Sequence, residues 1–268
     1  MTRAELVAQI RAKHSCLCVG LDTDIQKIPK HLLKEKNPIL AFNKAIIDAT
    51  KDYCVAYKPN LAFYEVLGAR GWEILEETLS YIPATHFTIA DAKRGDIGNT
   101  SKMYAKTFFE TYNFDAITIA PYMGCDSVQP FLEFEGKWAI LLALTSNTGA
   151  QDFERLKLEN DSLVYQEVVQ KAQQWGTPDK LMYVVGATAP DALKDIRRLA
   201  PEHFFLIPGV GAQGGDLEEV MEAATNKDVG VLVNASRSIL YADDSIDFQK
   251  FSEREAIKLT EVMRRWCF

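Results

Sequence analysis

Long apolar runs are missing from this sequence. No stretch of its 268 residues approaches the ~18 consecutive apolar residues that a membrane-spanning helix needs. Residues 1–14 also lack the apolar centre of a secretory signal. We therefore expect a cytoplasmic protein that has no membrane partner.

Cysteine and histidine are scarce, with five and four copies. An odd number of scattered cysteines is not typical of a disulfide-rich fold, and no Cys or His pair has the spacing of zinc ligands. We expect reduced thiols, mostly buried, and no bound metal. The cysteines are Cys16, Cys18, Cys54, Cys125 and Cys267.

An excess of positive charge is also missing. The 37 acidic residues outnumber the 30 basic ones, and the net charge of −7 argues against a nucleic-acid-binding surface. An anionic ligand would have to be bound by a local cluster of positive groups. Because no linker rich in glycine, serine or proline interrupts the chain, we expect one domain over residues 1–268.

What the sequence does contain is a repeated alternation of short apolar runs and amphipathic segments. Near-continuous hydrophobicity is typical of parallel strands that are buried on both faces. About eight strand–helix repeats in ~250 residues predict a (β/α)8 TIM barrel. A doubly wound sheet is the alternative, because alternation does not show whether the sheet closes. The predicted strands are Cys16–Asp22, Cys54–Asn60, His86–Lys93, Ala116–Pro121, Ala139–Asn147, Met182–Thr188, Phe204–Val210 and Val229–Ser236.

Capping signals place several helix starts. We expect an N-terminal helix within residues 1–14, and further helices that begin at Asn37-Pro38, at Asp161 and at Ala189-Pro190. Capping boxes are expected at Thr2/Glu5 and Ser252/Glu255.

Charged residues gather where the predicted strands end, which is where barrel enzymes carry their active sites. Asp91 and Lys93 are two residues apart on one strand and therefore share a face. Lys58 ends the neighbouring strand, and Asp96 follows on the loop. A carboxylate beside an ammonium keeps the lysine protonated, so Lys93 is a candidate proton donor. The alternative is a ladder of structural salt bridges.

A second cluster suits a phosphate group. The loop after the seventh predicted strand contains Gly209, Gly211, Gly214 and Gly215, so that backbone N–H groups can approach an anion. Arg237 follows the eighth strand and offers a bidentate fork. Loops after strands seven and eight often bind phosphate in barrels, although such a glycine-rich loop can also be a simple turn.

The segment from Asp91 to Thr100 resembles the motif of a known family. Its sequence, DAKRGDIGNT, has the pattern Asp-x-Lys-x-x-Asp-Ile-x-x-Thr of orotidine 5′-phosphate decarboxylases. The likeness runs from about Cys16 to Ile239, and the segment Tyr57–Tyr64 resembles the longer bacterial subgroup (type 2). The resemblance implies a ribulose-phosphate-binding type of barrel, no cofactor, and a reaction that converts orotidine 5′-monophosphate (OMP) to UMP and CO2.

The resemblance also implies a division of labour among the charged residues. Lys93 matches the residue that protonates C6 of the pyrimidine, while Asp91 and Lys58 match residues that flank the leaving carboxylate and position Lys93. Asp96 and Thr100 match residues that the family contributes across a dimer interface. A homodimer with shared active sites is therefore implied.

The remaining matches concern substrate binding. By resemblance, Asp22 holds ribose hydroxyls, Ser146 binds the amide edge of the pyrimidine, and Gln213 and Arg237 bind the phosphate. Gly209 and Gly211 belong to the same phosphate loop. A backbone contact from Gly214 or Gly215 could take the place of Gln213.

Three other functions stay open at this point. Mg²⁺-dependent sugar-phosphate lyases of the same barrel superfamily also carry Asp-x-Lys-x-x-Asp, although Ile97 and Thr100 favour the pyrimidine enzyme. A Schiff-base aldolase would need a lysine in an apolar setting, whereas Lys58 and Lys93 lie among carboxylates. A nucleotide-binding barrel without activity would be expected to lack part of the charged cluster.

Overall fold

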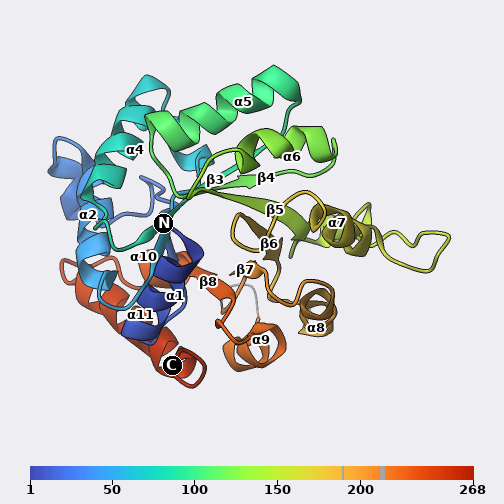
Figure 1. The fold of residues 1–268 in the computed structure, drawn as a ribbon. Coiled ribbons are helices and arrows are strands. Elements are labelled where there is room, and N and C mark those ends of the chain that lie inside the picture. Colours follow the sequence, from blue (N-terminus) through green and yellow to red (C-terminus); the bar gives the residue numbers. More distant parts are fainter. Residues whose placement is uncertain (189, 212–214) are drawn as a thin grey trace.

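Eight parallel strands form a closed barrel in the order β1 to β8 (Figure 1). The structure is a computed structural model that describes residues 1–188, 190–211 and 215–268. Pairing of β1 with β8 closes the sheet, which confirms the barrel over the doubly wound alternative. The strands are β1 (Leu17–Gly20), β2 (Ala56–Lys58), β3 (Phe87–Arg94), β4 (Ala116–Ile119), β5 (Trp138–Leu144), β6 (Leu181–Val185), β7 (Phe204–Pro208) and β8 (Val231–Ala235).

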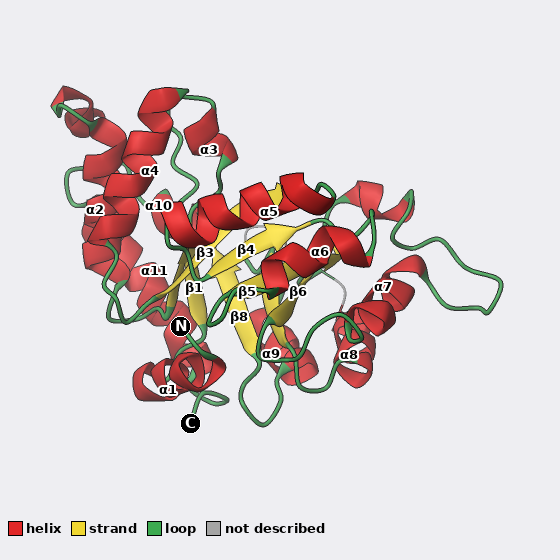
Figure 2. Ribbon diagram, turned by 45° about the horizontal axis from the view of Figure 1, so that its top comes forward, coloured by secondary structure: helices red, strands yellow, loops and turns green. Residues whose placement is uncertain are grey.

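Helices surround the barrel, and both chain ends lie near the first of them (Figure 2). The segment 152–163 extends away from the body of the protein (Figure 2). The helices are α1 (Arg3–Lys13), α2 (Pro38–Thr50), α3 (Ala62–Glu65), α4 (Ala69–Tyr81), α5 (Gly98–Lys106), α6 (Cys125–Leu132), α7 (Val164–Ala172), α8 (Pro190–Leu199), α9 (Leu217–Ala224), α10 (Arg237–Leu240) and α11 (Phe248–Met263). Short turns of other helix types are η1 (Lys30–Lys34), η2 (Thr107–Thr111) and η3 (Thr148–Gln151).

The capping predictions had mixed outcomes. Asn37 caps α2, whose first residue is Pro38, and Thr2 forms a capping box with Glu5 at α1. Helix α8 begins at Pro190 as predicted, while Ala189 lies outside the described residues.

Two of the predicted caps are wrong. Asp161 adopts a positive φ of 66° in the turn before α7, and that helix starts only at Val164, where the Gln166 side chain accepts a hydrogen bond from the Leu163 N–H. Ser252 lies within α11, where its hydroxyl donates to the Ile239 carbonyl. Neither polar side chain caps a helix: Asp161 lies in a turn before α7, and the Ser252 hydroxyl bonds to the carbonyl of a distant residue.

The two halves of the barrel interior differ in character. Asp91, Leu142 and Leu206 face inward, and strand alternation places Phe87, Trp138 and Phe204 on the same side four or two residues earlier. These three rings are fully buried and meet edge to face, with centroid distances of 6.0 and 6.2 Å. The amino-terminal half is therefore plugged by aromatic side chains, which leaves the carboxyl-terminal half for a polar site.

The cysteine prediction is confirmed. All five thiols are free, and only Cys125 is exposed. Among the described residues, no helix is both long enough and apolar enough to cross a membrane.

Candidate active site

A cavity of about 220 Å³ opens at the carboxyl-terminal end of the barrel. Strands β2 to β7 all contribute to its wall, as expected for a barrel whose strand ends point to one mouth. The polar lining consists of Lys58, Asp91, Lys93, Thr118, Thr145, Ser146 and Asn147, and the apolar lining of Leu142, Val184, Leu206 and Pro208.

Asp91 is the centre of the charged cluster. Its Oδ2 accepts a hydrogen bond from Lys58 Nζ at 2.7 Å, and its Oδ1 accepts one from Lys93 Nζ at 2.5 Å. The hydroxyl of Thr118 on β4 adds a third bond to Oδ1 at 3.1 Å. The structure thus brings together three of the four charged residues that the sequence pattern predicted for this cluster, and adds Thr118, which was not predicted.

Burial and charge oppose each other in this cluster. Burial alone would raise the pKa of Asp91, but the ammonium groups of Lys58 and Lys93 outweigh it and hold the pKa well below its usual range. Burial would likewise lower the pKa of Lys58, yet the negative charges of Asp91 and Asp22 raise it. Lys58 is buried and fixed, whereas the Lys93 side chain is 50% exposed and faces the mouth. Lys93 is therefore the cation that a ligand can reach.

Lys93 lies at an irregularity of β3. Its φ of 47° is unusual for a residue with a side chain, and the register with β4 shifts between Ala90 and Arg94. The Lys93 N–H donates to the Thr118 hydroxyl at 2.9 Å, so one threonine stabilises both the bulge and the carboxylate beside it. Such backbone conformations persist where the surroundings fix them, and they cluster at functional sites.

The loop after β1 is clamped by two tyrosines. Tyr64 donates its hydroxyl proton to the Leu21 carbonyl, and Tyr241 donates to the Asp22 carbonyl, each at 3.0 Å. The Asp24 N–H in turn donates to the Tyr241 oxygen at 2.8 Å. Asp22 Oδ1 is buried and has no hydrogen-bond partner in residues 1–188, 190–211 and 215–268. The backbone is thus fixed while one carboxylate oxygen stays available.

The end of β5 is stabilised by Glu154, a residue that no sequence pattern singles out. Glu154, on the segment that precedes α7, accepts bonds from the Thr145 N–H at 2.7 Å and from the Thr145 hydroxyl at 2.9 Å. These bonds fix the turn that carries Ser146 at the cavity wall. No local sequence pattern predicts this contact, because Glu154 lies nine residues after Thr145 in the chain.

The predicted phosphate loop is only partly described. Gly209 and Gly211 have φ values of 98° and 69°, which glycine adopts without strain, and the Gly211 N–H donates to the Gly215 carbonyl. Gln213 and Gly214 lie outside the described residues. Arg237, the first residue of α10, is exposed and forms no ion pair with any residue that the structure describes.

Asp96 and Thr100 stand apart from the cavity. The Asp96 carboxylate accepts a bond from the Ile97 N–H at 2.8 Å, and Thr100 is exposed on α5. Within the described part of one chain, no hydrogen bond joins either residue to the Lys58–Asp91–Lys93 cluster. Exposed apolar side chains lie in the same part of the chain, namely Ile97, Met103, Tyr122 and Met123.

The fold and the site define a class of protein: a TIM barrel with a charged cavity at the carboxyl-terminal end of its strands. The family model that matches residues 15–247 is that of the orotidine 5′-phosphate decarboxylase / HUMPS family, and the chain belongs to this family.

Individual relatives agree with the family match. The chain is 56% identical over 268 residues to a protein of Phocaeicola vulgatus and 58% identical over 266 residues to one of Christiangramia forsetii. Both are named orotidine 5′-phosphate decarboxylase, and each alignment covers at least 97% of either protein. Among solved structures, OMP decarboxylase of Leishmania donovani superposes with a TM-score of 0.83 at 35% identity, over 98% of this chain and 99% of that one.

Proposed function

We propose that this protein is an orotidine 5′-phosphate decarboxylase, a carboxy-lyase that converts OMP to UMP and CO2 in pyrimidine biosynthesis. Relatives with this name match nearly the whole chain at more than half identity. The observation that carries the proposal is the array of two lysines bonded to one buried carboxylate at the cavity wall.

The chemistry follows from the charges of this array. When the bond between C6 and the carboxylate breaks, its electron pair stays on C6 and CO2 leaves. The Lys93 ammonium stabilises that pair where it develops and then transfers a proton to C6. Asp91 holds the ammonium in place, so little reorganisation is needed during the reaction. Lys58 neutralises Asp91 from the buried side.

Binding of the nucleotide is assigned to the rim of the cavity. Asp22 would accept hydrogen bonds from ribose hydroxyls, and Ser146 would contact the pyrimidine amide edge. Arg237 and Gln213 would bind the phosphate, together with the backbone of Gly209 and Gly211. The unpaired oxygen of Asp22 and the exposed guanidinium of Arg237 support this assignment. Phosphate binding at a distance from C6 can then supply binding energy that raises kcat.

The active site would be completed by a second copy of the chain. Within the described residues, Asp96 and Thr100 make no hydrogen bond to the cluster of their own chain, and we assign them to a homodimer interface. The exposed Ile97, Met103, Tyr122 and Met123 supply apolar surface for such an interface. Free thiols support a cytoplasmic location.

A magnesium-dependent reaction would need several oxygen ligands around one cation. Among the described residues, no three His, Cys, Asp or Glu side chains lie close enough to hold a metal ion. Asp91 is the one carboxylate that lines the cavity in the described part of the chain, and it is already bonded to both lysines and to Thr118. This arrangement does not fit a divalent cation.

The test is the ultraviolet absorbance of OMP incubated with purified protein and EDTA. A fall in absorbance with UMP as the product is expected. Activity on a keto-sugar phosphate with Mg²⁺, and none on OMP, would move the protein to the metal-dependent relatives. No turnover of either substrate would leave only nucleotide binding.

A further inference from the structure

The barrel carries an inward-facing amide, Asn234 on β8, that the proposed mechanism does not use. Asn234 is 8% exposed, and the strand register sets it between Pro208 of β7, which lines the cavity, and Cys18 of β1. Its Nδ2 donates to the Ser236 hydroxyl oxygen at 3.2 Å. Its Oδ1 is buried and has no partner in the described part of the chain. A buried amide oxygen without a hydrogen bond is unfavourable, so a ligand or water group is expected there.

The neighbouring strand leaves room for the amide. Gly20 of β1 has no side chain, and a Cβ built at this position would lie 1.9 Å from Ser236 Oγ and 3.4 Å from Asn234 Oδ1. Any other residue at Gly20 would therefore displace the Ser236 hydroxyl, which accepts the hydrogen bond from Asn234. Gly20 pairs with Lys58 of β2 in the sheet register, so the space beside the amide lies next to the charged cluster.

Several hydrogen-bonding groups around this space lack partners among the described residues. Asn234 Oδ1 on β8 and Asp22 Oδ1 in the loop after the adjacent strand β1 are both buried acceptors without partners among the described residues. Lys58 Nζ has three N–H groups, and Asp91 is the one acceptor that the described residues provide for them. A hydroxyl can donate its one proton to one of these oxygens while it accepts from the ammonium. Two neighbouring hydroxyls, as a ribose carries, would therefore satisfy all three residues.

We propose that Asn234 is a sugar-binding residue that accepts a hydrogen bond from a ribose hydroxyl of the bound nucleotide. Its N–H group keeps Ser236 in place at the same time. Because a hydroxyl both donates and accepts, either orientation of the amide group can meet it. This inference rests on the proposed function, since it takes the ligand to be a ribonucleotide, and it makes Asn234 a second protein contact for the sugar beside Asp22.

The test compares wild type with Asn234→Ala on three substrates: OMP, 2′-deoxy-OMP and 3′-deoxy-OMP. For OMP, we expect kcat/KM to fall about tenfold, the size of one hydrogen bond to a buried partner. For the substrate that lacks the hydroxyl in question, the same substitution should lower kcat/KM less than about twofold, because the bond is already missing. An equal loss on all three substrates would overturn the proposal, since a purely structural residue affects them alike.

A matched control is an amide at the other end of the barrel. Asn226 donates through Nδ2 to the Pro201 carbonyl at 2.9 Å, far from the strand ends that form the cavity. Asn226→Ala should lower the melting temperature without changing the ratio of kcat/KM values among the three substrates. If Asn234→Ala does not fold, Asn234→Ser, a shorter polar residue, serves in the same comparison.

A binding measurement separates this inference from the proposed function. If wild type does not decarboxylate OMP, the proposed function fails, and calorimetry with UMP, 2′-deoxy-UMP and 3′-deoxy-UMP still tests Asn234. Weaker UMP binding by Asn234→Ala, with unchanged binding of one deoxynucleotide, supports the sugar contact. If wild type turns over OMP but the losses are equal, only the Asn234 proposal fails.

Discussion

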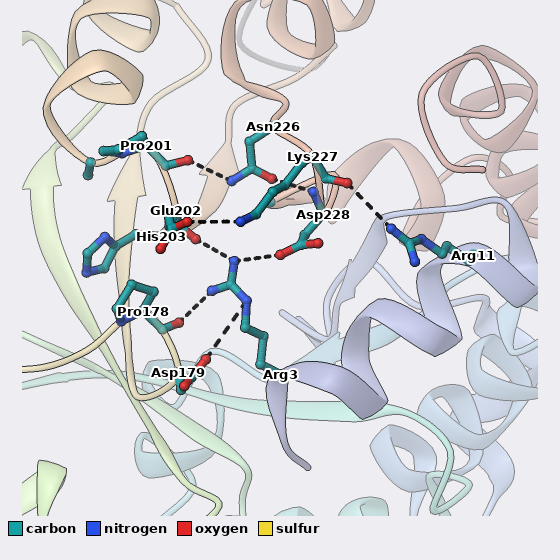
Figure 3. A network of polar contacts seen from close by, with 12 residues as sticks. Arg3, Arg11, Pro178, Asp179, Pro201, Glu202, His203, Asn226, Lys227 and Asp228 are labelled. Atoms are coloured by element: carbon teal, nitrogen blue, oxygen red, sulfur yellow. Dashed lines mark hydrogen bonds and ion pairs between the residues drawn. The ribbon is translucent and has the colours of Figure 1, made fainter.

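The two ends of the barrel differ in how their buried oxygen atoms are paired. At the amino-terminal end, Arg3 donates to the carbonyls of Pro178 and Glu202 at 2.8 and 2.6 Å and pairs with Asp228 at 3.1 Å (Figure 3). At the carboxyl-terminal end, oxygens of Asp22 and Asn234 lack partners in the described part of the chain. The Arg3 contacts connect loops at the amino-terminal end, whereas the oxygens of Asp22 and Asn234 can accept hydrogen bonds from a ligand.

Cavity size alone would have pointed to the wrong end. A hollow of about 650 Å³ lies beside α1, lined by Arg3, Arg11, Asp179 and Asp228 among others, and is about three times larger than the cavity at the strand ends. Its arginines are occupied by carbonyls and carboxylates, as Figure 3 shows for Arg3 and Arg11. The strained backbone of Lys93, and buried carboxylate and amide oxygens that lack partners among the described residues, distinguish the candidate active site better than its volume does.

The largest expected effect comes from removing the reachable cation. Lys93→Ala should lower kcat at least about 10³-fold, because it removes both the stabilising charge and the proton donor. UMP binding, measured by calorimetry, should persist in a folded protein. Lys227→Ala, which removes an exposed lysine paired with Glu202 at the other end, is the control and should keep full activity. Substantial turnover by Lys93→Ala would exclude the proton-donor role.

A subunit-mixing experiment asks whether the carboxyl-terminal end is completed by a second chain. Asp96→Asn and Lys93→Ala should each be nearly inactive alone. After exchange, half of the dimers are hybrids with one intact site, so roughly a quarter of wild-type activity should return. The absence of recovery, with exchange verified by differently tagged chains, would show that Asp96 acts within its own chain or not at all.

A pair of arginine variants contrasts the two ends directly. Arg237→Ala should raise KM for OMP about 10- to 100-fold with little change in melting temperature, because its guanidinium is exposed and free to bind phosphate. Arg3→Ala should leave KM unchanged and lower stability by about 2–4 kcal/mol, since it removes a mostly buried charge from its acceptors. Steady-state kinetics give KM for both variants, and thermal melts give their stability. A raised KM for Arg3→Ala, or a destabilised Arg237→Ala with unchanged KM, would refute the predicted difference between the two ends.

The sequence was sufficient for the fold and for the centre of the site. Strands of a closed parallel barrel are buried on both faces, so their hydrophobic runs stand out from the amphipathic segments between them. Lys58, Asp91 and Lys93 were predictable because parallel strand ends meet at one mouth, which turns three separate positions into one cluster.

Residues that depend on precise packing could not be predicted in this way. Thr118 became part of the site because β3 bulges at Lys93, and the sequence pattern gives no sign of that bulge. Glu154 reaches Thr145 from a segment with no regular periodicity. No sequence pattern singles out Asn234, and only the structure shows that its Oδ1 lacks a partner among the described residues, with Gly20 and Ser236 beside it.

The smallest expected effect concerns a histidine at the amino-terminal end. Burial, followed by the positive charges of Arg3 and Arg197, lowers the pKa of His203 to about 4, and neither ring nitrogen has a partner among the described residues. Between about pH 6.5 and pH 4 the unfolded chain binds a proton that the folded protein does not, so acidification through this window reduces stability. From pH 7 to pH 5 the loss should be about 1–2 kcal/mol.

His203→Phe should remove that part of the pH dependence, because a phenyl ring can pack on Tyr183, 5.2 Å from the imidazole, without binding a proton. Urea unfolding of both proteins at pH 7 and pH 5 measures the difference, and kcat/KM for OMP at pH 7 should be unchanged. An identical loss of stability in the variant would mean that His203 is protonated in the folded protein too. The amino-terminal end would then hold a buried charge for which the described residues provide no acceptor.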